Sequence, residues 1–211
     1  MNKLVEKIIE RIPVDTFTDT TVSHLVPGSP HKRYGLLKRA IKTGGVIHLR
    51  RGLYALSKKY QRRPINLYEI AQKIYGPSYV SFESALSYYG WIPEAVYAVT
   101  SASLKRSREV KTPLGLFSYH HIPSHKFFAG VDRTSSTDGI FLMATPWRAL
   151  VDYMFIHKKN WKGLKSIIED LRIDESHFQN VNFRLLEDLR EASPNKRVKR
   201  FIDIIKKEIM T

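Results

Sequence analysis

The chain has 211 residues, 43% of them hydrophobic, and a formal net charge of +15 at pH 7. This charge favours a polyanionic partner, and the lack of cysteine excludes disulfides, thiolate metal sites and a cysteine nucleophile. No apolar run approaches the ~20 residues of a membrane span, and acidic residues interrupt the apolar N-terminal stretch, which argues against a signal peptide. We therefore expect a cytoplasmic protein that makes no membrane contact.

Two short amphipathic segments open the chain. Apolar residues at helical spacing predict a helix over residues 2–11, which Pro13 ends. Residues 15–25 predict a second helix with Thr18 or Asp19 as its N-cap. A Pro-Gly pair then predicts a turn into the next helix.

A strongly basic helix is predicted from Pro30 to about Thr43. Ser29 supplies a hydroxyl for the N-cap, and a proline follows at the first helical position. The glycine pair at 44–45 predicts the C-terminal end. Apolar spacing favours an inward face, and the opposite face is polar and basic. The residues expected inward are Tyr34, Leu37 and Ile41; those expected outward are Lys32, Gly35, Leu36 and Arg39, flanked by His31, Lys38 and Lys42.

A short basic hairpin follows this helix. Residues 46–49 predict a strand, 50–52 a tight turn and 53–56 the returning strand. Residues 31–63 contain eleven Lys or Arg and no Asp or Glu, whereas a merely solvated surface would mix the two signs. Three helices and a hairpin of this size predict a winged helix-turn-helix domain that binds DNA, over residues 1–63.

The candidate DNA-binding residues lie on the basic helix and at the hairpin tip. Lys32 and Arg39 are expected to reach guanine edges, because long donors on an outward helix face enter the major groove. Arg50 and Arg51 should hold phosphate or enter the minor groove. The full set is Ser29, His31, Lys32, Arg33, Gly35, Lys38, Arg39, Lys42, Arg50 and Arg51.

The rest of the chain predicts a second domain. Residues 57–64 are polar, basic and end in proline, which is typical of a boundary, and residues 64–211 carry a net charge of only +5. Helices are expected over residues 66–75, 82–89, 147–157, 162–172, 183–191 and 196–210, and strands over 95–101, 116–122 and 139–143. The expected fold class is α+β: an N-terminal winged helix-turn-helix, then a mixed α/β domain with a small sheet and a helical C-terminus.

Four segments occur in the order found in one known family. They read VIHLRRGLYAL from Val46, YVSFESALSYYGWIP from Tyr79, GLFSYHHIP from Gly115 and ATPWRALVDYMF from Ala144. Through these ordered segments the chain resembles, over nearly its whole length, the AbiEi-type antitoxins of type IV toxin–antitoxin, or abortive-infection, systems. The one departure is Trp147-Arg148, where the family more often has an acidic-basic pair.

The resemblance implies two activities. The N-terminal domain would bind inverted repeats in double-stranded DNA and repress its own promoter. The C-terminal domain, residues 64–211, would counter a co-encoded nucleotidyltransferase-like toxin without requiring a stable complex. The protein would then not be an enzyme.

A nuclease is the main alternative. Glu109-Val110-Lys111 has the E-x-K pattern of a metal-dependent nuclease strand, which needs a second carboxylate nearby. The nearest upstream acid, Glu94, lies beside a proline, and residues 105–111 are too polar for a buried strand. We therefore expect an exposed loop or edge strand there. A repressor that responds to a small ligand is a further alternative.

Other titratable residues do not predict a catalytic, metal or cofactor site. His120 and His121 would face opposite sides of a strand, so neither they nor His125 are expected to share a metal ion. Asp152 lies in an otherwise apolar helix and is expected to pair with a nearby arginine or cap a loop.

Overall fold

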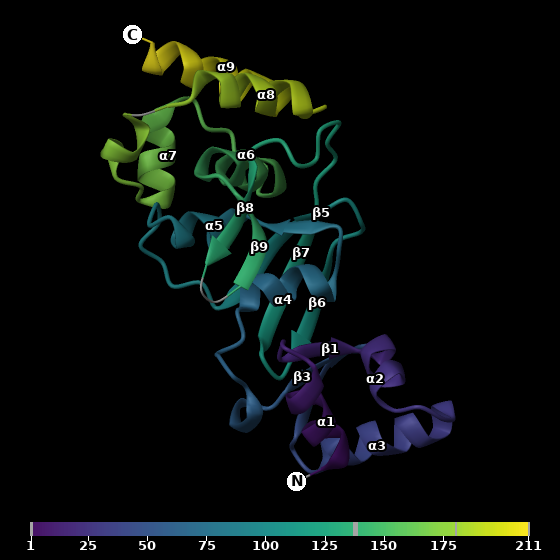
Figure 1. Cartoon of the computed structure of the whole chain (residues 1–211). Coiled ribbons are helices and arrows are strands. Elements are labelled where there is room, and N and C mark those ends of the chain that lie inside the picture. Colours follow the sequence, from purple (N-terminus) through teal and green to yellow (C-terminus); the bar gives the residue numbers. More distant parts are fainter. Residues whose placement is uncertain (1, 137–138, 180, 211) are drawn as a thin grey trace.

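The computed structural model describes residues 2–136, 139–179 and 181–210, and it combines α-helices with two β-sheets (Figure 1). The predicted α+β class is therefore confirmed. In the described ranges, no helix is both long enough and apolar enough to cross a bilayer. Below, residues 2–63 are called the head, and the described residues from 64 onward are called the body.

The head places three helices on a small antiparallel sheet with strand order β1-β3-β2. Its elements are α1 (Lys3–Arg11), β1 (Thr16–Thr18), α2 (Asp19–Leu25), α3 (Pro30–Lys42), β2 (Val46–Arg50) and β3 (Leu53–Leu56), followed by a 3-10 turn, η1 (Lys58–Tyr60). The predicted helices at residues 2–11 and 30–43 and the predicted hairpin are confirmed.

The second predicted helix starts later than expected. Residues 16–18 form β1 instead, because Phe17 is buried in the head while the strand pairs with β3. Thr18 is the N-cap of α2, as predicted, and closes a capping box with Thr21.

The body is built on a mixed six-stranded sheet with order β6-β7-β5-β4-β9-β8. Its strands are β4 (Ser78–Val80), β5 (Ala98–Ser103), β6 (Arg108–Thr112), β7 (Gly115–His121), β8 (Val131–Ser136) and β9 (Gly139–Ala144). The sequence did not predict β4 or β8, and β5 begins three residues later than expected. The edge strand foreseen for residues 105–111 is confirmed as β6.

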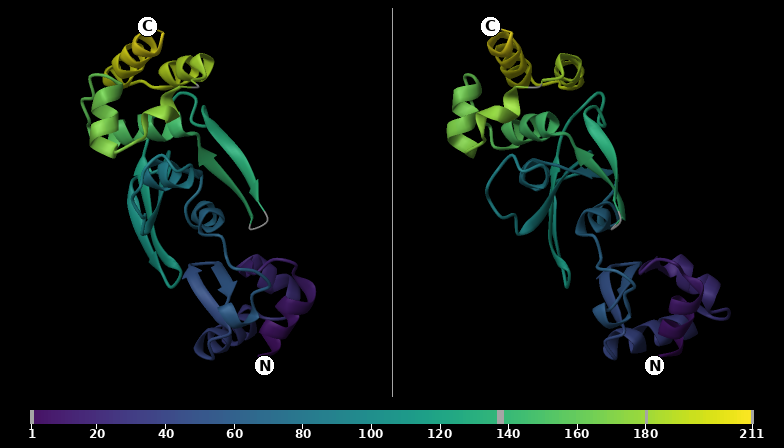
Figure 2. Two further views of the ribbon diagram at one scale, coloured as in Figure 1. Left: turned by 90° about the vertical axis from the view of Figure 1, so that its left-hand side faces the viewer. Right: turned by 60° about the vertical axis from the view of Figure 1, so that its left-hand side comes forward.

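Helices cover the sheet and form one end of the molecule. They are α4 (Leu67–Ile74), α5 (Phe82–Tyr88), α6 (Pro146–Ile156), α7 (Leu164–Leu171), α8 (Phe183–Ala192) and α9 (Lys196–Ile209), with a 3-10 turn, η2 (Glu175–Phe178). Each corresponds to a predicted helix, with ends that differ by a few residues. The views in Figure 2 place α7, α8 and α9 at the end opposite the head.

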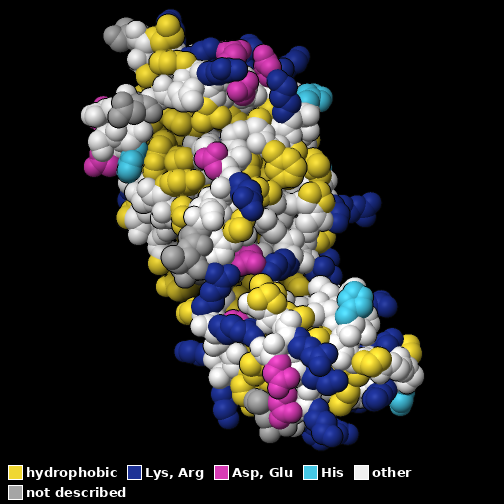
Figure 3. Space-filling model, viewed as in Figure 1, with side chains coloured by type: hydrophobic (Ala, Val, Ile, Leu, Met, Phe, Trp, Pro, Cys, Tyr) yellow, Lys and Arg dark blue, Asp and Glu magenta, His cyan; other side chains and the backbone are white. Residues whose placement is uncertain are grey.

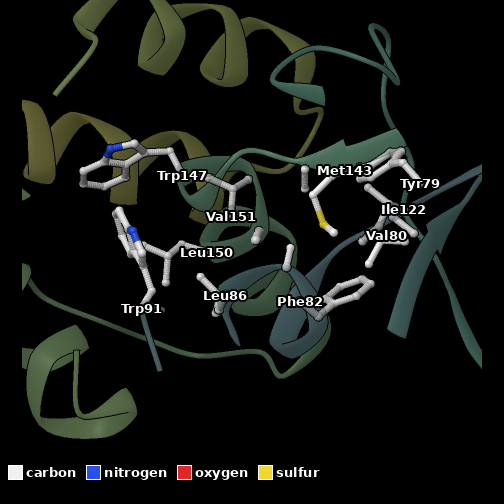
Figure 4. Packing of buried hydrophobic residues seen from close by; sticks show 14 of the residues in the cluster. Tyr79, Val80, Phe82, Leu86, Trp91, Ile122, Met143, Trp147, Leu150 and Val151 are labelled. Atoms are coloured by element: carbon white, nitrogen blue, oxygen red, sulfur yellow. The ribbon is translucent and has the colours of Figure 1, made fainter. Parts of the chain in front are cut away.

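Two hydrophobic clusters stabilise the fold. One lies inside the head and includes Leu4, Ile8 and Leu56. The larger one fills the body, where the rings of Trp91 and Trp147 meet edge to face at 5.8 Å (Figure 4). The body cluster also includes residues of the head hairpin, namely Leu49, Leu53 and Ala55.

The hairpin therefore lies between the two clusters. All four side chains of β3 are buried, and they alternate between the two faces of the strand. Leu53 and Ala55 pack in the body cluster, whereas Tyr54 and Leu56 pack in the head cluster. A polar contact also joins the neighbouring strand β1 to the body, since the Lys73 ammonium on α4 donates to the Thr16 hydroxyl at 2.8 Å. The predicted boundary at residues 57–64 is thus a change in composition, while packing continues across it.

Candidate nucleic-acid interface

The basic helix α3 has well-defined ends that come from its sequence. The Ser29 hydroxyl accepts a hydrogen bond from the Lys32 amide at 3.3 Å, and Pro30 occupies the first turn. At the other end the chain turns through Gly44, whose φ is +70°. Gly45 then passes so close to Val5 that a β-carbon there would lie 2.9 Å from a valine methyl. The helix is therefore capped at its N-terminus and packed against α1 where it ends.

The inward face of α3 differs from the prediction. Leu37 and Ala40 are the buried residues, whereas Tyr34 is 64% exposed and Ile41 is 36% exposed. Leu36, expected outward, packs against the head cluster. The helix is rotated because the small Ala40 side chain, fully buried, allows α3 to pack closely on α1.

The rotation brings a different set of residues to the centre of the outward face. His31, Gly35, Lys38 and Lys42 share it, at i, i+4, i+7 and i+11. The remaining predicted residues Lys32 and Arg39 flank them, and all of these positions are exposed. Tyr34 joins this surface, although the sequence analysis had placed it in the core. The exposure of Tyr34 could have been predicted from the sequence if Ala40 had been counted among the inward residues of the helix.

Gly35 has open space around it. A β-carbon built there would meet no atom within 4 Å. Packing within the protein therefore does not require glycine at this position of the exposed face, although glycine weakens a helix by about 1 kcal/mol relative to alanine.

Two of the predicted arginines are bound within the protein. Arg33 is half-buried and donates from Nη1 to the carbonyl of Gly28 at 2.6 Å, which holds the turn between α2 and α3. Arg50 donates from Nε and Nη2 to the carbonyl of Lys73, and from Nη1 to the carbonyl of Arg51. Arg33 therefore stabilises the head, and Arg50 joins the head to the body.

Arg51 lines a groove beside α3. The groove has a volume of about 590 Å³ and lies between α2, α3 and the hairpin. Arg33 and Tyr34 belong to its α3 wall, and Asp19 adds a carboxylate on the α2 side. Burial raises the pKa of Tyr54, which also lines the groove, and a hydrogen bond with Asp19 raises it further.

The distribution of charge separates the head from the far end of the body. Figure 3 shows many Lys and Arg side chains around the head with a smaller group of Asp and Glu among them, and over α8 and α9 basic and acidic side chains are interspersed. At that end the ion pairs include Arg190–Asp203 at 2.7 Å and Lys126–Glu191 at 2.8 Å. Such pairing neutralises much of the local charge. The cations on the exposed face of α3 have no such pairing among the described residues.

The body contains a buried polar cluster that we call the Asp152 cluster. Asp152 accepts hydrogen bonds from Arg148 Nε at 3.0 Å and from the hydroxyls of Tyr79 and Ser81, both at 2.8 Å. Arg148 also donates to the carbonyl of Ala129 at 3.1 Å. The prediction that Asp152 pairs with an arginine is confirmed.

Burial and the neighbouring charges set the protonation of the groups in the Asp152 cluster. Burial raises the pKa of Tyr79 well above its ordinary value, and the Asp152 carboxylate raises it further. Burial opposes the charge on Arg148, but the neighbouring Asp152 and Tyr79 together outweigh it, and the pKa of the guanidinium is raised. The cluster is therefore a neutral tyrosine bound to an ion pair, sealed inside the body.

The residues considered for nuclease or metal chemistry are dispersed. Glu109 is exposed on β6, where it pairs through its backbone with Ser118. His120 packs on Phe82 of α5 at 5.1 Å, while the preceding Tyr119 packs on Tyr75 on the other face of the sheet. Within the described ranges no three His, Asp or Glu side chains come together in a way that could hold a metal ion.

Comparison with known proteins does not identify the chain. No protein-family model matches it, and no curated protein matches it.

Proposed function

We propose that the chain is a double-stranded DNA-binding protein that acts as an autorepressing antitoxin, with a winged helix-turn-helix in its head. The observation that carries this proposal is the outward face of α3. It presents Lys38 and Lys42 with His31, Lys32 and Arg39 around an unobstructed Gly35, and residues 31–63 contain no acid.

The order of the elements supports this assignment. The elements follow the order α1-β1-α2-α3-β2-β3, and the returning strand β3 lies between β1 and β2. In this arrangement α3 is the second helix of the helix-turn-helix and β2–β3 is the wing. The 13 residues of α3 span about 20 Å, a length that fits along the major groove.

The direction of the α3 face supports contact with a duplex. Figure 1 places α3 at the end of the molecule, away from the body. Lys38, Arg39 and Lys42 would then bind phosphates or base edges, while Gly35 allows the backbone to approach the groove. Because Arg50 is bound to Lys73, the wing would contribute mainly through Arg51.

The antitoxin activity rests on the sequence resemblance. Two of its matching segments supply the Asp152 cluster, since Tyr79 and Ser81 come from one and Arg148 and Asp152 from the other. The cluster would keep the body in the form that opposes a nucleotidyltransferase-like toxin. Repression at inverted repeats would use two copies of the head.

Fluorescence anisotropy with the promoter of the chain's own operon tests the proposal. The wild-type chain should bind this duplex more tightly than a scrambled one. Lys38→Ala with Lys42→Ala should abolish the preference, whereas Lys58→Ala with Lys59→Ala removes the same charge from η1 and should preserve it. Equal binding to both duplexes by the wild-type chain would refute sequence-specific recognition. Co-expression with the neighbouring toxin gene tests protection separately, by cell growth.

A further inference from the structure

A second concave surface with positive charge lies at the far end of the body. It is a cavity of about 250 Å³ between the segment that precedes α7 and the exposed side of α9. Its walls are Met154, Asn160, Trp161, Lys162, Arg197, Arg200, Phe201 and Ile204. Figures 1 and 2 place these elements at the opposite end of the molecule from α3.

The walls of the cavity are held in place by buried aromatic rings. Trp161 is only 6% exposed and stacks parallel to Tyr153, with centroids 6.0 Å apart. Its indole N–H donates to Asp170 at 2.8 Å, and its ring also packs on Phe201 of α9 at 5.7 Å. Lys162 follows directly and therefore faces α9 from a fixed segment.

Helical spacing brings the two arginines to the same side. Arg197 and Arg200 are three residues apart, and Ile204 continues the same face of α9. The helix begins at Asn195, whose side chain accepts hydrogen bonds from the amides of Arg197 and Val198. The position of Arg197 in the first turn is thus determined by the cap.

The three cations of the cavity lack carboxylate partners. In the described ranges no Asp or Glu pairs with Lys162, Arg197 or Arg200, although elsewhere on α8 and α9 cations are paired, as in Arg190–Asp203. The nearby acids are used elsewhere. Asp170 binds Trp161 and Lys159, and Glu208 accepts from the amide of Leu164. The positive charge of the cavity is therefore uncompensated.

Arg197 has an unused donor inside the protein. Its Nη2 donates to the carbonyl of Phe155 at 3.4 Å, but its Nε is buried and has no hydrogen-bond partner in the described part of the chain. Buried polar groups almost always have a partner, and leaving a charged donor without one is costly. The Arg197 guanidinium therefore has donor capacity that the described part of the protein does not use.

We propose that the cavity binds the phosphate groups of a small molecule. A guanidinium group offers donors in a planar fork that matches phosphate oxygens, and two such groups with an ammonium match a ligand of two or three negative charges. A polynucleotide backbone instead requires a continuous track of free cations. Arg190 and Lys206, two neighbouring cations of α8 and α9, are paired with carboxylates, so the concave site favours a compact phosphate ligand.

Isothermal titration calorimetry of the full chain at low salt tests this site. Inorganic phosphate, pyrophosphate and ATP are the probes, and pyrophosphate and ATP are expected to bind saturably with one site per chain. If pyrophosphate and ATP bind equally, the phosphates alone are recognised; tighter binding of ATP would identify a nucleotide. Failure of all three probes to bind would overturn the proposal.

Variants locate the binding. Arg200→Gln and Lys162→Gln should each weaken pyrophosphate binding about tenfold, the loss expected for a charge-assisted hydrogen bond. Lys196→Gln removes one charge from the same turn of α9 outside the cavity and should leave the affinity unchanged. Arg197→Lys keeps the charge but loses the planar fork of guanidinium donors, so it should bind pyrophosphate more weakly than the wild type.

Three outcomes would contradict the assignment. Wild-type affinity in Arg200→Gln would place the anion elsewhere. A loss of affinity caused only by the Lys38→Ala, Lys42→Ala pair would place it on the head. Tighter binding of a single-stranded oligonucleotide than of ATP at the Arg200 site would indicate a nucleic-acid backbone instead. Because Arg200 is exposed, its substitution tests binding without disturbing the core.

Discussion

Arg50 at the hairpin of the head donates two hydrogen bonds, at 3.2 and 3.0 Å, to the backbone carbonyl of Lys73 in the body. The adjacent Arg51 has an exposed side chain that lines the groove beside α3. Two consecutive arginines thus differ in environment, and the proposed function gives Arg50 a structural role and Arg51 a role in binding DNA.

The two arginines should respond differently to salt. Arg51→Ala should lower the slope of log Kd against log salt concentration by about 1, because one phosphate contact is lost. Arg50→Ala should leave the slope unchanged and lower the melting temperature. Anisotropy titrations at several salt concentrations and thermal melts check both. Reversed effects would show that Arg50 leaves Lys73 to bind DNA.

Gly35→Ala should change stability and DNA binding in opposite directions. The free energy of unfolding should rise by up to about 1 kcal/mol, because alanine favours the helix and a β-carbon has room in the free protein. Operator affinity should fall, because the added methyl prevents close approach to the groove. Denaturant melts and anisotropy measure the two effects. Unchanged affinity would show that the backbone at Gly35 does not approach DNA.

Asp152→Ala should destabilise the body strongly. The substitution leaves Arg148 buried without its counter-ion and removes the acceptor of two hydroxyls, so we expect a loss of about 3–5 kcal/mol in the free energy of unfolding. Urea denaturation checks this. Asp203→Ala, which breaks an exposed ion pair with Arg190, is the control and should have a far smaller effect. A stable Asp152→Asn variant that fails to protect cells would instead point to a direct role in antitoxicity.

Acid should weaken the fold through His120. Burial lowers the pKa of His120 below its ordinary value of 6.5; nearby Glu83 opposes this shift and His157 adds to it. The unfolded chain then binds this proton more readily than the folded chain. Stability should therefore decrease as the pH falls below about 6.5 and be fully present above it.

Removing the imidazole tests this assignment. His120→Gln should show a smaller loss of stability than the wild type between neutral pH and a pH of about 5. His48→Gln, at an exposed position in the head, is the matched control and should retain the wild-type dependence. Equal pH profiles for the wild type and His120→Gln would assign the acid sensitivity to other groups. Urea melts across this pH range supply the profiles.

The helices were predictable because their signals are local. Ser29 and Thr18 cap the helices that the sequence assigns to them. The strands β4 and β8 were not predictable from local signals. The first has only three residues and the second is largely polar, so both depend on pairing with distant partners. The same reason applies to β1.

The candidate site was predictable only in part. Its basic composition is a property of the sequence, and the exposure of Lys38 and Lys42 agrees with it. The rotation of α3 depends on how Ala40 packs against α1, which a pattern of large apolar residues does not include. The position of Arg50 depends on Lys73, which lies 23 residues away in the sequence.

Strand β3 carries a thermodynamic consequence. Because its two faces are buried in two hydrophobic clusters, the head cannot unfold without exposing part of the body cluster. The two parts should therefore melt in a single cooperative transition. A duplex that binds only the folded head would then raise the melting temperature of the entire chain by mass action and slow proteolysis as far away as α9.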